Sequence, residues 1–227
     1  MKKIRVLDIE FENEIKAWEV PGFRSAVIQL AGKENTLFHN HLGKDYSFAY
    51  PLIQYKRILK KPHLVRIEDG VDEVHHFFEN KQEGLMFGDR HYELNVENIH
   101  LNRFTIQVWD KSFNYFIQDW LAFNQDNYKV YKSLPFDLER IEFLEKILMG
   151  NILSFAKGIG WSVEKEIKLR IIDVLRTNIV SVKGVKREAF TLRFATNVFL
   201  PNNIGLGKNA SIGFGVVKEE VKRNKNI

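Results

Sequence analysis

The chain contains no cysteine in its 227 residues. This absence excludes disulfide bonds, thiolate metal sites and cysteine nucleophiles, and it suits a reducing compartment. A bound metal ion would need imidazole and carboxylate ligands instead. The chain has seven histidines and 29 aspartates and glutamates to supply them.

Long hydrophobic runs are also missing. No apolar run approaches the roughly 18 residues that a membrane helix needs. In the N-terminal stretch MKKIRVLDIEFENEIK, charged residues interrupt the apolar ones, so the continuous apolar region of a signal peptide is absent. We therefore expect a soluble cytoplasmic protein without a membrane partner. Its 44% hydrophobic content can form a core in one large domain or two small ones.

Charge of one sign is concentrated at the C-terminal end. Residues 1–156 hold 20 Lys and Arg against 23 Asp and Glu, a net charge of −3, whereas residues 157–227 hold 14 against 6, a net charge of +8. Such a basic segment favours contact with a polyanion such as nucleic acid. A basic face that only meets water is the alternative.

The first half of the chain alternates strand-like and helix-like segments. Residues 3–12 and 101–110 have strand-forming residues, residues 21–32 and 69–80 have helical spacing, and residues 50–59 and 63–69 form two β-like runs around KKP. The order β-α-β-β-α-β is typical of the ferredoxin-like fold.

The second half repeats this order less regularly. We expect strands at 113–123 and 128–134, a helix at 135–160 capped by Asp137, a hairpin turning at Gly184, and a last strand within 210–221. The predicted fold is α+β, with tandem ferredoxin-like (βαββαβ, RRM-like) domains at residues 1–112 and 113–227, the second one degenerate.

A glycine-rich motif, GLGKNASIGFG, stands near the C-terminus with the spacing G-h-G-x5-G-h-G. Its glycines are Gly205, Gly207, Gly213 and Gly215. Glycines allow a backbone to approach a ligand closely, so this loop can direct amides at phosphate while Lys208 adds charge. Asn209 follows the Gly-Lys pair where a Walker loop has Ser or Thr, so ATP-type binding is not supported. A pair of bulges in a β-hairpin is the alternative.

Two histidines, His39 and His41, lie close together in TLFHNHLGKDYSFAYPLIQYK, residues 36–56. They could be a metal pair, an acid–base pair or an accident of a polar loop. In an extended segment the two side chains project to one side, but a catalytic metal site normally takes three protein ligands, and the spacing indicates no third. Near neutral pH an imidazole can both accept and donate a proton.

The Gly-rich motif, the tandem βαββαβ order and the block LFHNH…YPLIQYK occur together. In these features the chain resembles, over nearly its whole length, the CRISPR-associated repeat-RNA endoribonucleases often called Cas six, of the RAMP superfamily. In the most similar branch FHNH after the first helix supplies the catalytic histidine, which places it at His39 or His41. Where those proteins often have a further tyrosine, this chain has Phe48 between Tyr46 and Tyr50.

The resemblance implies cleavage of CRISPR repeat RNA without a metal or other cofactor. The 2′-hydroxyl beside the scissile phosphate is the nucleophile, and a 2′,3′-cyclic phosphate remains. We expect His41 as the base, His39 or Tyr46 as the acid, and Lys56 as a stabiliser of charge on the phosphoryl oxygens. Gly205, Gly207, Lys208, Gly213 and Gly215 would bind the RNA.

The partner implied by the resemblance is precursor CRISPR RNA. A homodimer and contacts with other subunits of a CRISPR effector complex are both open. So is the alternative that the chain is a non-catalytic RNA-binding subunit of such a complex. A protein that binds a small molecule fits the basic C-terminal third less well.

Overall fold

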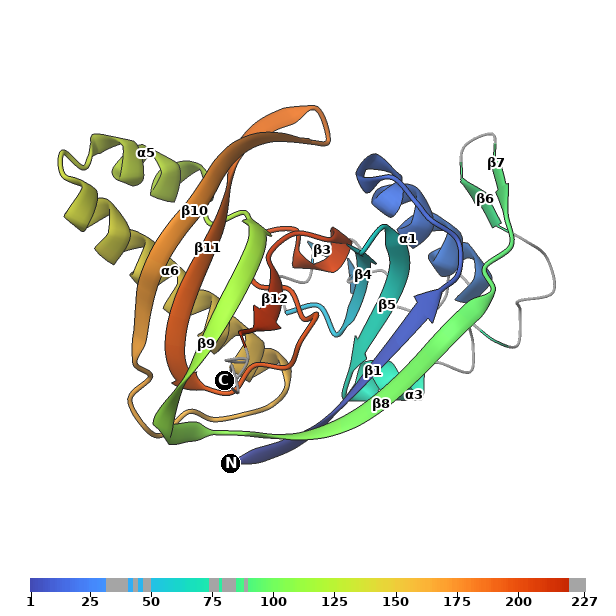
Figure 1. The fold of residues 1–227 in the computed structure, drawn as a ribbon, viewed down its shortest axis with the longest axis horizontal. Coiled ribbons are helices and arrows are strands. Elements are labelled where there is room, and N and C mark those ends of the chain that lie inside the picture. Colours follow the sequence, from blue (N-terminus) through green and yellow to red (C-terminus); the bar gives the residue numbers. More distant parts are fainter. Residues whose placement is uncertain are drawn as a thin grey trace, which may run out of the picture.

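The computed structural model describes residues 1–31, 41–42, 45–46, 50–73, 78, 85–87 and 90–220. Two four-stranded antiparallel sheets form its frame, and the chain passes from one to the other at Gln107. Figure 1 shows the two sheets in the two halves of the molecule, with the C-terminal strand and its preceding loop between them. The sequence prediction places the domain boundary a few residues later, after residue 112.

The first sheet has the strand order β4-β5-β1-β8, which is the order of a ferredoxin-like fold. Its first helix crosses one face of the sheet. The elements are β1 (Lys2–Phe11), the 3-10 turn η1 (Ala17–Glu19), α1 (Val20–Ala31), β4 (Ile53–Ile58), β5 (Lys61–Ile67), α3 (Asp69–Asp72) and β8 (Val96–Ile106). Four short strands complete this half: β2 (His41–Leu42), β3 (Asp45–Tyr46), β6 (Leu85–Phe87) and β7 (Arg90–Tyr92).

The second sheet repeats this order as β10-β11-β9-β12. A long helix takes the place of α1, and a loop with one 3-10 turn takes the place of the second helix, so this domain is a degenerate copy of the fold. Its elements are β9 (Val108–Trp120), α5 (Gln125–Ser133), α6 (Asp137–Gly158), β10 (Leu169–Val182), β11 (Val185–Val198), η2 (Ala210–Ile212) and β12 (Val216–Glu219). The prediction of an α+β fold with two ferredoxin-like domains is confirmed.

Two local predictions were wrong. Residues 128–134, expected as a strand, lie mostly in helix α5, because the side chain of Asn124 caps that helix by accepting a bond from the amide of Asn127 at 2.7 Å. The expected cap of the long helix is also incorrect, since Asp137 is its first helical residue and the preceding Phe136 stands at the cap position. None of the helices in the described ranges is both long and apolar enough to cross a bilayer.

Side chains along each strand of the first sheet alternate between its two faces, and each face contacts a different part of the protein. On β1, Leu7 and Ile9 pack toward helix α1, whereas Ile4 and Val6 join the core of the second domain. The same alternation on β4 directs Ile53 and Tyr55 toward α1. Gln54 and Lys56, which lie between and after them, must therefore face the second domain, where both are completely buried.

Candidate functional site

The Gly-rich segment 205–215 lies against the first sheet and β9. Gly205 forms an isolated antiparallel bridge with Val216, and η2 occupies the middle of the segment. A Cβ at Gly205 would stand 2.3 Å from the Nζ of Lys56, and one at Gly207, where φ is +86°, would stand 2.5 Å from the Nε1 of Trp120. These glycines are required because the loop packs tightly on both domains.

Side chains from β4 and its approach hold this loop. The hydroxyl of Tyr50 donates to the carbonyl of Gly205 at 2.9 Å. The amide of Gln54 donates to the Tyr50 oxygen at 2.9 Å, and its oxygen accepts from the amide of Gly205 at 2.8 Å. Burial raises the pKa of Tyr50 far above its usual range, so the hydroxyl keeps its proton for this bond. The three groups form a closed ring of hydrogen bonds that joins the two domains.

Lys56 is a second support of the loop. Its Nζ donates to the carbonyl of Ala210, at the start of η2, at a distance of 2.5 Å. The side chain is completely buried, and this burial lowers the pKa of the lysine to about 7. The sequence predicts that Lys56 contacts the RNA phosphate, whereas in the structure its amine faces the inner side of the Gly-rich loop.

A third link between the domains is a cluster that the sequence analysis missed. Asp8 lies between His63 and Asn203: its carboxylate contacts the Nδ1 of His63 at 2.9 Å and accepts from the Nδ2 of Asn203 at 2.7 Å. Asn203 stands just before the Gly-rich segment. No sequence spacing relates three residues so far apart, so only the alternation of β1, which places Asp8 on the same face as Val6, could have suggested it.

On its other side the loop is fixed to the end of β9. The amide of Lys208 donates to the carbonyl of Leu121 at 3.0 Å, and the amide of Gly215 donates to the carbonyl of Asp119 at 3.3 Å. Five amides of the loop are therefore engaged inside the protein, those of Gly205, Leu206, Lys208, Ile212 and Gly215. Lys208 is exposed, and the bond of its amide to Leu121 fixes the backbone from which the side chain extends.

The other candidate catalytic residues, His39, His41 and Tyr46, lie in the segment before β4. His39 is outside the described residues, and for His41 and Tyr46 the structure describes only the backbone. His41 and Tyr46 are opposite each other in the β2–β3 pair, and residues so paired have Cα atoms about 4.5–5.5 Å apart. Tyr46 is four residues before Tyr50, a reach of at most about 14 Å. The pair is therefore near the strand that holds the Gly-rich loop.

Metal ligands do not cluster among the side chains that the structure describes: no three histidine, aspartate or glutamate residues come together there. The Asp8–His63 pair has an amide, from Asn203, as its further partner. The side chains of His39 and His41, the pair that raised the question of a metal, lie outside the part of the chain that the structure describes.

Several solved structures have the fold of this chain. A crystal structure of Cas6b superposes with a TM-score of 0.88 at 26% identity, over 96% of this chain and 100% of that chain. A structure of the CRISPR RNA processing endoribonuclease Cas6b has a TM-score of 0.74, also at 26% identity and with the same coverage. Csf5, a type IV Cas6 crRNA endonuclease, has the same fold at a TM-score of 0.55 and 10% identity, covering 97% of this chain and 100% of that one.

The sequence was also compared with known proteins and with models of protein families. A protein of Methanocaldococcus jannaschii, named Uncharacterized protein MJ0978, is 41% identical over 102 residues, which are 45% of this chain and 68% of that protein. The Cas6b N-terminal domain model matches residues 2–105, and the Cas6b C-terminal domain model matches residues 107–220. Together the two models span nearly all of the sequence, and the chain belongs to the Cas6b family of CRISPR-associated endoribonucleases.

Proposed function

We propose that this protein cleaves CRISPR repeat RNA without a metal ion, leaving guide RNA with a 2′,3′-cyclic phosphate. The observation that carries this proposal is the pairing of His41 with Tyr46 in strands β2 and β3, which precede β4, the strand that supports the Gly-rich loop. A 26% identical relative is a CRISPR RNA processing endoribonuclease, which supports RNA as the substrate.

The chemistry needs one group to remove a proton and another to supply one. His41 takes the proton of the 2′-hydroxyl, and that oxygen attacks the adjacent phosphorus in line. The bond from phosphorus to the 5′-oxygen of the next nucleotide breaks, and His39 or Tyr46 protonates the leaving oxygen. An imidazole with an ordinary pKa of about 6.5 is suited to accept the proton near neutral pH.

The Gly-rich loop holds the RNA by its phosphates in this scheme. Lys208 provides the cation, and Gly207 and Gly213 allow the positive-φ turns that present it. Lys56 supports the loop from behind, so in our proposal it positions the RNA-binding surface and does not touch the phosphate. The +8 net charge of residues 157–227 strengthens attraction of the RNA to this domain.

The test is incubation of the protein with repeat RNA in excess EDTA. We expect one discrete cut, and an upstream product whose 3′ end becomes a substrate for end labelling only after the cyclic phosphate is opened and removed. Loss of cleavage in EDTA with rescue by a divalent ion contradicts the metal-independent mechanism. Tight binding with no cleavage under any condition means that the chain is instead a non-catalytic RNA-binding subunit.

A further inference from the structure

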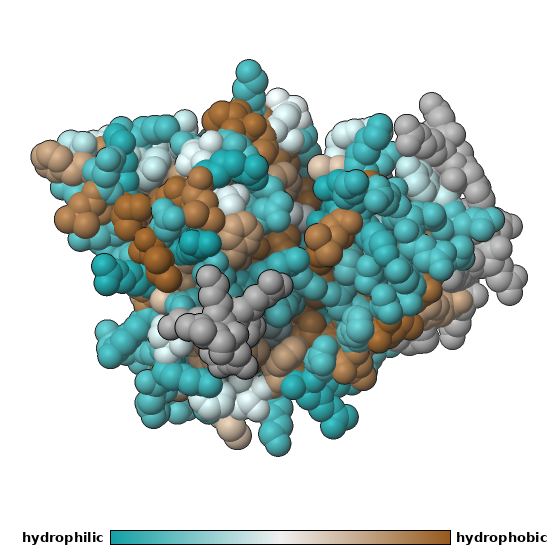
Figure 2. Space-filling model, in the orientation of Figure 1, coloured by the Kyte–Doolittle hydropathy of each residue, from teal (hydrophilic) through white to brown (hydrophobic). Residues whose placement is uncertain are grey.

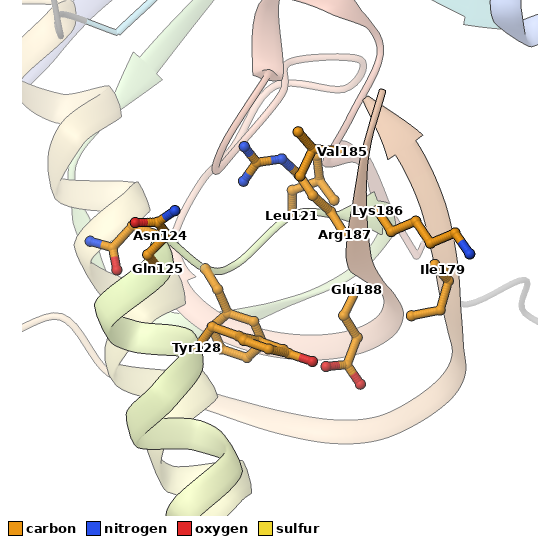
Figure 3. A pocket seen from close by; sticks show the side chains of 10 residues that line it. Leu121, Asn124, Gln125, Tyr128, Ile179, Val185, Lys186, Arg187 and Glu188 are labelled. Carbon is orange, nitrogen blue, oxygen red and sulfur yellow. The ribbon is translucent and has the colours of Figure 1, made fainter. Parts of the chain in front are cut away.

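The second domain contains a cavity of about 480 Å³ outside the loop and histidine region described above. It lies between the first turn of α5 and the tip of the β10–β11 hairpin (Figure 3). The residues with aromatic or polar groups that line it are Phe123, Asn124, Gln125, Tyr128, Lys186, Arg187 and Glu188.

The walls of this cavity have the groups that recognise a planar, polar ring. Tyr128 is 41% exposed, and its ring is 5.8 Å from that of the buried Phe123. The side chains of Asn124 and Gln125 lie on the α5 side, and in Figure 3 the guanidinium of Arg187 extends from β11 toward them. An aromatic face with amide and guanidinium groups beside it can stack a nucleobase and bond its edge.

Two polar atoms of residues that line the cavity are buried without a hydrogen-bond partner in the part of the chain that the structure describes. One is the Oε2 of Glu188, which has the Nζ of Lys132 at 3.2 Å as an ion-pair partner. The other is the Nε of Arg187, a donor without an acceptor. A buried donor without an acceptor costs free energy, and a ligand with a carbonyl or ring-nitrogen acceptor would remove that cost. Nucleobases present such acceptors on their edges.

The charge around the cavity suits an RNA strand. Lys183 and Lys186 are exposed at the hairpin tip beside Arg187, whereas Glu188, the acidic residue in the lining, is within 3.2 Å of the Nζ of Lys132. That ion pair reduces the repulsion between the carboxylate and a phosphate. Figure 2 shows that hydrophobic side chains also reach the surface of this half of the molecule, and those of the second domain include Val130, Phe136, Ile179 and Val185.

The cavity is next to the Gly-rich loop. Leu121, which lines it, forms a bridge with Lys208, and Phe214 of the loop packs on the cluster of Leu121, Val182 and Ala189. A strand whose phosphate lies at Lys208 can therefore place a neighbouring base in the cavity.

We propose that this cavity binds one unpaired nucleobase of the RNA, stacked on Tyr128 and bonded by Arg187 and the amides of Asn124 and Gln125. This inference rests on the proposed function, because it takes RNA as the ligand. It adds a base-specific site to a loop that contacts phosphates, and so a source of substrate selectivity.

The experiment measures affinity for a set of repeat RNAs, each with one abasic nucleotide and a 2′-deoxy sugar at the cut site to prevent cleavage. For the parent protein we expect one position at which removal of the base weakens binding about 5- to 150-fold, the usual value of one base stacked on an aromatic side chain. In Tyr128→Ala the intact RNA should bind less tightly by a similar factor, and the penalty at that position should disappear.

Two variants control for the fold and for surface changes. Tyr128→Phe keeps the ring and should keep the abasic penalty. Val130→Ala changes an exposed residue of the same helix that does not line the cavity, and it should behave as the parent. The proposal is wrong if Tyr128→Ala and the parent show the same loss of affinity at every abasic position. If Arg187→Ala weakens binding while Tyr128→Ala does not, the cavity binds a phosphate and not a base.

Cleavage of the unmodified RNA by the parent protein separates the two proposals. If the parent cleaves the RNA but its affinities for the abasic RNAs do not depend on Tyr128, the base site is wrong and the endoribonuclease proposal stands. If those affinities depend on Tyr128 but the RNA is not cleaved, the base site stands and the protein is an RNA-binding subunit. If the parent binds none of the RNAs, both proposals are wrong.

Discussion

The amine of Lys56 is 2.5 Å from the carbonyl oxygen of Ala210, which lies 154 positions later in the chain. This bond joins β4 of the first domain to the Gly-rich loop of the second. The bonds of Tyr50 and Gln54 to Gly205 make the same connection a few residues away. The strand that follows the candidate catalytic hairpin therefore also fixes the loop that we propose for RNA, so the two parts of the site share one support.

Burial of Lys56 predicts a pH-dependent stability. The folded-state pKa of about 7 is below the ordinary 10.5, so between these values the unfolded chain binds more protons and stability rises with pH. The increase has a limiting slope of about 1.4 kcal/mol per pH unit for one such group. Lys56→Met should remove this slope when urea unfolding is measured from pH 7 to pH 10. Lys146→Met, on an exposed part of α6, should leave the slope in place. Parallel curves for the parent and Lys56→Met would show that folding does not lower the pKa of this lysine.

Gly205→Ala should destabilise the fold. Its Cβ would meet the Nζ of Lys56 and would stand 2.8 Å from the backbone oxygen of Ala210, so the lysine amine must move and the backbone of the loop must shift. Overpacking of this kind costs roughly 1–3 kcal/mol. The matched control is Gly150→Ala, inside α6, where a Cβ meets nothing within 4 Å and should stabilise by about 0.5–1 kcal/mol. Equal urea midpoints for the two variants would contradict the tight packing of the loop.

Lys208→Ala should weaken RNA binding before it affects chemistry. A contact to a phosphate of single-stranded nucleic acid contributes about 0.7 to the slope of log affinity against log salt concentration. We expect the slope to become less steep by about that amount, as measured by fluorescence anisotropy at several salt concentrations. Lys146→Ala provides the control for the loss of one surface charge. Unchanged affinity of Lys208→Ala at every salt concentration would mean that the loop has only a structural role.

His41→Ala should reduce the rate of cleavage and leave binding nearly unchanged. Loss of a general acid or base lowers a rate by roughly 10²- to 10⁴-fold. Single-turnover kinetics on repeat RNA, with His39→Ala and Tyr46→Phe measured beside it, assigns the roles. A larger loss in His39→Ala exchanges the two histidines, and normal rates in all three variants place the chemistry elsewhere.

Much of the fold was accessible from local sequence signals. The 3.6-residue period of apolar residues predicted helix α6. Gly184, which has a positive φ, predicted the turn of the β10–β11 hairpin. Helix α5 was missed because Tyr128, Val130 and Tyr131 resemble a strand in composition. The cap at Asn124 was the stronger signal, and the packing of Tyr131 on Phe123, at 4.7 Å between rings, favours the helix in three dimensions.

The site was less predictable than the fold. The sequence analysis singled out the glycines of the loop, but the reason for Gly205 is a side chain, Lys56, that is distant in the sequence. Lys56 was expected to stabilise charge on the phosphoryl oxygens, and its burial could not be predicted because it depends on which face of β4 meets the other domain. Asp8, His63 and Asn203 come together only through the packing of β1, β5 and the loop.

The most direct test of the central claim is the rate of cleavage of a repeat RNA with a single 2′-deoxy sugar at the cut site. Attack by the 2′-oxygen requires that this RNA bind as tightly as the all-ribose form and remain uncut, while a 2′-deoxy sugar one nucleotide away has no effect on cleavage. Cleavage of the RNA lacking the 2′-hydroxyl at the unmodified rate would show that water is the nucleophile, and the proposed mechanism would be wrong.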